Sequence, residues 1–291
     1  MAEISLKEYQ DKLEALLRAN QVDETIHHCR HILQYFPRSA PTYRYLGRAL
    51  MAAQNLEEAA EVFRRVLSVF PDDAATHTNL GIICNQLGRY DEAIWHLERA
   101  YEQDTSSAEL QDALRELYRE HRRVDHARLQ LTVGAVARQY VRNGLYGEAV
   151  ESLRQALAAN PRQADLHLLL TRTLWDSDMN VEEAEAALDT LEILPDCLEA
   201  NRIIARFWLD EGRPSDAQRY VSRMEAVDPY AAYRLAQGSE PPENAFALLE
   251  LDYGRVVERR LATEEPDWLG NLSVPAAETG VPAPADTGAS D

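Results

Sequence analysis

Three histidines and a cysteine stand together in His27-His28-Cys29-Arg30-His31, the segment of this 291-residue sequence that most resembles a metal-binding motif. His27 and His31 are four residues apart, so both imidazoles could reach one ion from a single helix face. Two nitrogens from one exposed face make a weak site, and no second segment supplies matching ligands. We therefore interpret these residues as surface histidines and expect no metal or other cofactor.

The three cysteines, Cys29, Cys84 and Cys197, are odd in number and far apart in the sequence. This spacing excludes a disulfide framework and a thiolate zinc site within one chain, and free cysteine is usually buried. The sequence also contains no glycine-rich phosphate loop and no Gly-x-Ser-x-Gly nucleophile motif. We expect no catalytic centre, so the chain is not predicted to be an enzyme.

Arg138, Arg172 and Arg206 are separated by 34 residues each. A planar guanidinium group can bind a carboxylate through two parallel hydrogen bonds, so a row of arginines suits an acidic ligand. Other residues share the spacing: Pro37 and Pro71; Pro161, Pro195 and Pro229; and Ala59, Ala93 and Ala127. A fixed period of this size indicates stacked copies of one small structural unit.

Each unit reads as helix, turn and helix. In the unit from Ala40 to Pro71, apolar residues recur at helical spacing on both sides of a polar break at Gln54-Asn55. Gly47 and Ala59 are small enough to let two helix axes approach closely. The proline ends the second helix because it cannot continue the hydrogen-bond ladder.

These residues resemble the tetratricopeptide-repeat family. The unit matches the family pattern through Tyr43, Leu46, Gly47, Leu50, Ala59, Phe63 and Pro71, and the next unit through Leu80, Gly81, Cys84, Ala93, Leu97 and Ala100. Weaker or comparable matches begin at Leu6, Gln130, Ala164 and Leu198. The resemblance covers about residues 5 to 229 and implies an all-α fold, a right-handed α-solenoid of helix hairpins that binds other proteins.

One unit departs from the pattern. Ala108 to Leu129 starts normally but the next unit begins early, so either its second helix is truncated or one long helix runs from Val124 to Arg142. We divide the chain into residues 1–107 with three repeats, 108–129 as an irregular repeat, 130–229 with three repeats, 230–262 as a capping segment, and 263–291 as an acidic, mostly disordered tail. A short helix is expected over 231–237 and an amphipathic capping helix over 243–262.

In the family, the first helix of each unit lines a concave groove. The matching positions in the C-terminal half are Arg138, Arg172, Arg206, Arg202, Leu168, Trp175, Val141 and Leu209. The resemblance therefore implies an apolar groove with a basic rib, suited to an acidic segment with large apolar side chains. In the alternative interpretation, the arginines pair with Asp165, Glu199 and Asp210, and Trp175 turns into the core.

A second, partial anion site is expected at Arg44, Arg48 and Asn79. These residues only partly match the positions that clamp a terminal carboxylate in some members of the family, because Glu109 stands where a cation is required.

The tail contains a candidate ligand. Residues 230–291 carry four Arg and eleven Asp or Glu, a net charge of −7, and include a compact acidic-aromatic segment over 264–272. Asp267 could cap one helical turn that groups Trp268, Leu269 and Leu272. The segment could dock in the groove of its own chain or of a second copy, or bind a separate partner; alternatively, Trp268 packs on the capping helix.

The net charge of −19 makes the protein a poor candidate for binding nucleic acid or an anionic membrane surface. The sequence has no apolar run long enough to span a membrane, and its start carries charge where a signal peptide needs apolar residues. We expect a cytoplasmic interaction scaffold or assembly adaptor with a protein or peptide partner. The alternative is a self-associating structural or regulatory subunit of a larger complex.

Overall fold

Several helix hairpins begin at a residue whose side chain caps the first helix and reverse through a left-handed residue. The hydroxyl oxygen of Ser39 accepts a hydrogen bond from the Thr42 amide, which satisfies one free N–H group at the start of the helix. That helix ends at Ala52, and the chain turns through Gln54, whose φ is 61°. Gly88 takes the same place in the next hairpin with a φ of 73°, where glycine meets no steric penalty.

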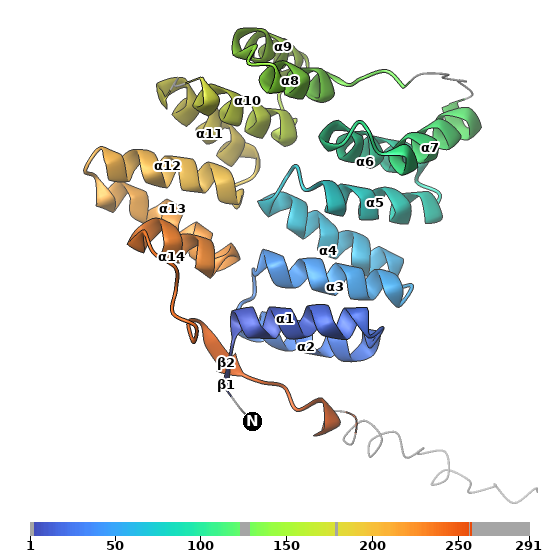
Figure 1. Cartoon of the computed structure of the whole chain (residues 1–291), viewed down its shortest axis with the longest axis vertical. Coiled ribbons are helices and arrows are strands. Elements are labelled where there is room, and N and C mark those ends of the chain that lie inside the picture. Colours follow the sequence, from blue (N-terminus) through green and yellow to red (C-terminus); the bar gives the residue numbers. More distant parts are fainter. Residues whose placement is uncertain (1–2, 123–128, 178–179, 256, 258–291) are drawn as a thin grey trace, which may run out of the picture. The chain divides into compact units, whose positions relative to one another are not determined.

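The computed structural model describes residues 3–122, 129–177, 180–255 and 257. Its elements in chain order (Figure 1) are β1 (Glu3–Ser5), α1 (Leu6–Arg18), α2 (Val22–Tyr35), α3 (Ala40–Ala52), α4 (Leu56–Val69), α5 (Ala74–Gln86), α6 (Tyr90–Gln103), α7 (Ala108–Leu117), a π-helical turn η1 (Tyr118–Arg122), α8 (Val133–Arg142), α9 (Tyr146–Ala159), α10 (Ala164–Asp176), α11 (Asn180–Ile193), α12 (Leu198–Asp210), α13 (Pro214–Val227), α14 (Pro229–Gln237) and β2 (Ala247–Leu249). Residues up to Leu251 form one compact unit, and Asp252–Asp291 form a second, which begins with a helical turn at 253–255.

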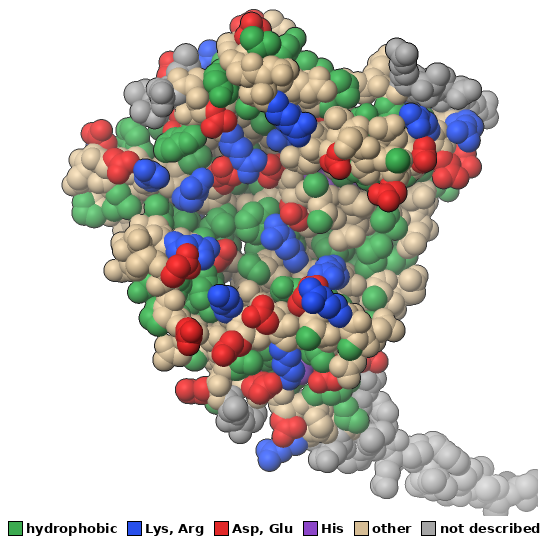
Figure 2. Space-filling model, in the orientation of Figure 1, with side chains coloured by type: hydrophobic (Ala, Val, Ile, Leu, Met, Phe, Trp, Pro, Cys, Tyr) green, Lys and Arg blue, Asp and Glu red, His purple; other side chains and the backbone are tan. Residues whose placement is uncertain are grey.

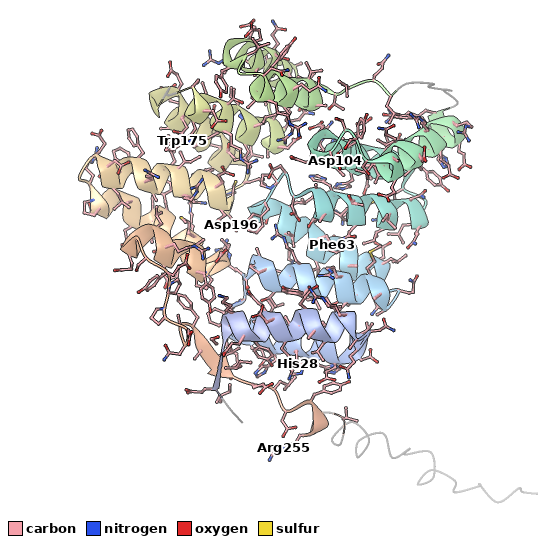
Figure 3. The ribbon with its side chains drawn as sticks, in the orientation of Figure 1. His28, Phe63, Asp104, Trp175, Asp196 and Arg255 are labelled. Atoms are coloured by element: carbon pink, nitrogen blue, oxygen red, sulfur yellow. The ribbon has the colours of Figure 1, made fainter. Side chains whose placement is uncertain are left out.

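Small side chains set the distance between paired helices, as predicted. A Cβ atom added to Gly47 on α3 would lie 2.6 Å from the ring of Phe63 on α4, which is labelled in Figure 3. The same addition to Gly81 on α5 would lie 2.6 Å from Leu97 on α6. These close contacts confirm the predicted fold class, an α-solenoid of helix hairpins.

The hydrophobic core is divided among neighbouring hairpins. One cluster joins α1 to α5, a second joins α5 to α7, a third joins α8 to α11, and a fourth joins α10 to α13. Each hairpin is therefore stabilised mainly by the hairpins beside it in the sequence, as expected for a repeat protein.

The continuous helix considered over Val124–Arg142 is wrong in its described part. Residues 129–132 are not helical, and α8 begins only at Val133. The hydroxyl of Thr132 accepts a hydrogen bond from the Ala135 amide, so Thr132 caps a new helix start. Residues 123–128 lie outside the described residues, and the truncated-helix alternative stays a prediction. α6 packs against both α7 and α8.

The amphipathic helix expected over 243–262 is wrong over residues 243–252, which are not helical; only 253–255 and 257 are helical among its described residues. Residues Ala247–Leu249 form β2, which pairs antiparallel with β1 so that Ile4 lies opposite Leu248. Leu248 is buried in the core cluster that also contains residues of α1 and α2. The strand therefore buries this apolar side chain while its pairing with β1 satisfies the backbone hydrogen bonds. The short helix expected over 231–237 is present as α14, and Gly238 ends it with a φ of 64°. Residues 258–262 are outside the described part of the chain.

The helices α1–α7, here called the N-terminal stack, also contact α8–α14, the C-terminal stack, far from the link between them. Ala40, Val69 and Val227 form a small buried cluster across the two stacks. Arg38 forms an ion pair with Asp196, which is labelled between the stacks in Figure 3. Within the described ranges, none of the helices combines the length and apolar character needed to cross a bilayer.

Candidate functional site

Two arginines of the predicted row face the N-terminal stack. Arg172 forms an ion pair with Asp72, in the loop between α4 and α5, and Arg138 lies 4.0 Å from the same carboxylate. Arg172 also forms an ion pair with Glu199 on α12. Burial alone would lower the pKa of Arg172, but these carboxylates raise it above the usual arginine value. The predicted row of arginines is therefore partly paired with acidic side chains of the same chain. One of them, Glu199, is a partner that the alternative interpretation named.

Arg138 is the most enclosed member of the row. Its side chain is 13% exposed, and burial lowers its pKa. Its Nε atom is buried without a hydrogen-bond partner among the described residues. This arginine is thus positioned to join the two stacks, and its guanidinium group offers little surface to a partner.

The outer end of the predicted groove forms a pocket of about 260 Å³ between α10, α11 and α12. Four of its lining residues are predicted site residues: Arg172, Trp175, Arg202 and Arg206. The other four are Glu199, which the alternative interpretation named as an arginine partner, and Asp176, Glu183 and Ile203, which were not predicted. We call these eight residues the α10–α12 pocket. Figure 3 labels Trp175 on α10, and many Lys and Arg side chains lie over the middle of the face drawn in Figure 2.

Two arginines at this pocket, Arg202 and Arg206, keep most of their hydrogen-bonding capacity, whereas Arg172 is paired with Asp72 and Glu199. Arg206 lies 3.6 Å from Asp210, and its guanidinium carbon is 5.5 Å from the centre of the Trp175 ring. Arg202 lies 3.6 Å from Glu199. Both arginine side chains are more than half exposed, and Trp175 is 46% exposed. Trp175 is therefore a surface residue, and the alternative that placed it in the core is wrong.

The remaining apolar residues of the predicted groove have different environments. Leu168 is wrong as a surface contact, because it is 1% exposed and packs in the core cluster between α10 and α13. The helix turns it toward α11 and α12, where burying a leucine stabilises the fold. Val141 is half-buried and Leu209 is exposed, and neither lines the α10–α12 pocket.

The residues of the second predicted anion site share one pocket. Arg44, Arg48 and Asn79 line a cavity of about 390 Å³ between α3 and α5. Arg44 lies 3.0 Å from Asp73, and Arg48 lies 2.8 Å from Glu14. Both arginines are therefore paired with acidic side chains, at shorter distances than the 3.6 Å that separates Arg202 and Arg206 from their acidic neighbours.

The predicted tail motif of Asp267, Trp268, Leu269 and Leu272 lies outside the described residues. The histidine segment does not assemble a metal site in the described part: no group of three potential ligands is present there. A ring nitrogen of His31 instead pairs with the carbonyl oxygen of Leu249 on β2, at 2.7 Å. Cys84 and Cys197 are buried, and burial is the largest cause that raises each thiol pKa to about 11.

No pattern in the sequence indicated that Asp72 or Glu183 belongs to the site. Asp72 contacts Arg172, which is far from it in the sequence, so the contact exists only once the two stacks have docked. Glu183 occupies a repeat position at which the acidic residues of other hairpins are exposed. Detecting either residue would require knowing how the two stacks dock and how α11 turns.

The stacked hairpins and their groove-facing first helices define a helical-repeat protein. Residues 44–108 and 140–193 match two models of the tetratricopeptide repeat, so the chain contains tetratricopeptide repeats in both stacks. Proteins of this family generally mediate protein–protein interactions. No curated protein matches the chain.

Solved structures with a similar arrangement include three helical-repeat proteins. The crystal structure of MamA is 20% identical to this chain; the match covers 62% of this chain and 92% of the MamA chain, with a TM-score of 0.28. PilF of Pseudomonas aeruginosa is 17% identical, covers 80% and 96%, and has a TM-score of 0.33. The TPR2AB domain of yeast Sti1, in a structure described as a pHSP90 complex, is 14% identical, covers 79% and 95%, and has a TM-score of 0.35.

Proposed function

We propose that this protein is an interaction module that binds an acidic, apolar segment of a polypeptide in the α10–α12 pocket, and that it is not an enzyme. One observation carries the proposal: exposed Arg202, Arg206 and Trp175 line a single cavity. The protein has a net charge of −19, whereas the lining of this pocket is formally neutral, with three arginines and three acidic residues.

The two kinds of side chain have separate roles in binding. Exposed ion pairs contribute only about 0.2–1 kcal/mol each, so the arginines mainly select carboxylates. An aromatic ring contributes more through buried apolar area, and Trp175 and Ile203 supply that surface here. A cavity of about 260 Å³ accommodates one or two side chains, so the rest of the segment would lie along exposed α12 residues such as Leu209.

The sequence contains a segment with the required chemistry. Residues 263–274 combine Glu264, Glu265 and Asp267 with Trp268 and apolar neighbours. A synthetic peptide of these residues is therefore a suitable first probe, whether the natural ligand is this tail or the tail-like segment of another protein.

The test measures binding of a rhodamine-labelled 263–274 peptide by fluorescence anisotropy. The full chain carries Trp268→Ala, so that its own copy of the segment does not compete. Arg206→Glu in this background should weaken binding about tenfold, equivalent to about 1.4 kcal/mol, because it reverses a charge facing the ligand. Arg154→Glu is the control, because Arg154 is exposed on α9 and the net charge changes equally. Equal affinity in the two variants would refute the pocket as the binding site.

The same segment supports the alternative of self-association. If the segment docks in a second copy, light scattering should give twice the monomer mass for the full chain and the monomer mass for Trp268→Ala. A monomeric mass for both proteins excludes docking in a second copy and leaves docking within the same chain or binding of a separate polypeptide.

A further inference from the structure

Glu183 on α11 is a buried acid with an unsatisfied oxygen in the α10–α12 pocket. The residue is 3% exposed, and its Oε1 atom is buried without a hydrogen-bond partner in the described part of the chain. A buried carboxyl oxygen that lacks a hydrogen bond destabilises the fold, so a partner that supplies the bond recovers this free energy.

The same position in other hairpins is solvated. Glu58 and Glu92 also precede the small alanine of the second helix, and both are exposed and lie near an arginine. Glu58 pairs with Arg30 at 2.8 Å, whereas Glu183 makes no ion pair within 4.0 Å to the described residues. The repeat therefore does not require a buried acid here, and the burial of Glu183 is particular to this pocket.

The charges around Glu183 come from the two helices that pack on α11. Arg172 and Asp176 line the pocket from α10, and Glu199, Arg202 and Arg206 line it from α12. Burial is the largest effect and raises the pKa of Glu183 to about 7. Arg202 and Arg206 act in the opposite direction, while Glu199 and Asp176 raise the pKa further.

We propose that Glu183 determines the specificity of this pocket: its protonated carboxyl group donates a hydrogen bond to a carboxylate of the bound segment, and binding is coupled to uptake of one proton. The inference rests on the proposed function. An ionised Glu183 would repel an incoming carboxylate, while the protonated form supplies an O–H donor beside the arginines. The proton comes from solvent and stays between the two carboxyl groups, so the complex gains one positive charge.

The test repeats the peptide titration at pH 6 and pH 8 with Glu183→Gln in the Trp268→Ala full chain. If only the protein with protonated Glu183 binds the peptide, the chain that keeps Glu183 should lose about tenfold in peptide affinity from pH 6 to pH 8, because the pKa of Glu183 is about 7. The Glu183→Gln amide is a neutral donor at both pH values, so its affinity should change less than twofold. The control is Glu182→Gln, because Glu182 is exposed on the same helix and should keep the tenfold change. Calorimetry in two buffers of different ionisation enthalpy should show proton uptake on peptide binding near pH 7 for the proteins that keep Glu183, and none for Glu183→Gln.

The outcomes separate the two proposals. Affinity that is equal at pH 6 and pH 8, or a pH dependence that Glu183→Gln retains, overturns the role of Glu183 and leaves peptide binding intact. Failure of all the proteins to bind the peptide at either pH overturns the proposed function and this inference with it.

Discussion

Arg172 on α10 forms an ion pair with Asp72, which precedes it by 100 residues in the sequence. Asp72 also accepts hydrogen bonds from the side chain of Gln103, at 3.3 Å to its carbonyl oxygen and 3.5 Å to its carboxylate. The loop between α4 and α5 thus places an acidic side chain on the arginine row of the C-terminal stack. The two stacks are thus joined by an arginine–carboxylate ion pair, the same interaction that we propose for ligand binding.

Replacing Asp72 with asparagine should weaken this contact between the stacks. The change keeps the shape and removes the charge, so the free energy of unfolding should fall by about 1–2 kcal/mol, moderated because Arg172 is one-third exposed. Urea unfolding monitored by circular dichroism gives the value. Asp112→Asn is the matched control, because Asp112 is 76% exposed and its loss should change stability by less than about 0.5 kcal/mol. Equal effects of the two variants would show that the Asp72 pair does not stabilise the fold.

Adding one methyl group should have opposite effects at two glycines. Gly47→Ala would place Cβ 2.6 Å from the buried ring of Phe63 and should cost about 1–3 kcal/mol. Gly147→Ala on α9 meets nothing within 4 Å and should be neutral or stabilise by up to about 1 kcal/mol. Thermal unfolding of both variants tests this. Adding Phe63→Leu to Gly47→Ala should cost less than the two single changes combined, and strict additivity would argue against the contact.

The helix hairpins could be predicted from the sequence, whereas the docking of the two stacks could not. Gly47, Ala59 and Pro71 impose local requirements that recur every 34 residues, so periodicity locates the helices. The Asp72–Arg172 pair depends on contacts between hairpins far apart in the sequence, and no local pattern encodes it. β2 was missed because three residues carry too little pattern to distinguish a strand from an apolar helix stripe.

Two buried histidines should make the protein less stable in mild acid. Nδ1 of His77 lies 2.9 Å from Nδ1 of His96, and Nε2 of His77 lies 3.0 Å from the Pro71 carbonyl. Because a carbonyl only accepts, His77 donates to Pro71 and accepts from the Nδ1–H of His96. This arrangement needs a neutral His77 ring, and burial is the largest cause that lowers the pKa of His96 to about 3 and also lowers that of His77.

The folded-state pKa of His96 is below its unfolded value of 6.5, so its stabilising effect is complete above pH 6.5 and is lost as the pH falls. The free energy of unfolding should therefore decline between pH 6.5 and 5. His96→Gln keeps a donor but does not titrate, so its decline should be smaller by about 1 kcal/mol per pH unit. Parallel pH profiles for the two proteins would contradict the neutral pair.

Tyr9→Phe should loosen β2 from the first hairpin. The buried Tyr9 hydroxyl oxygen accepts a hydrogen bond from the Leu251 amide at 3.0 Å and lies 2.7 Å from Nδ1 of His28. Without the hydroxyl group, the Leu251 amide should exchange its hydrogen at least tenfold faster, as mass spectrometry of the peptide containing it can measure. Tyr35→Phe, at an exposed tyrosine of α2, should leave this exchange unchanged. A similar rate in wild type and Tyr9→Phe would show that other contacts hold β2.

The pairing of β1 with β2 changes how the repeat array can come apart. An array with free ends can fray from either end and lose its hairpins one after another. Here the first hairpin is bound to the segment after the last one by strand pairing, by the Tyr9 hydrogen bond and by a 2.7 Å ion pair between Lys12 and Glu250. Neither end can peel away alone, so unfolding should be a single cooperative transition, and force applied at the two strands should meet a sharp mechanical threshold.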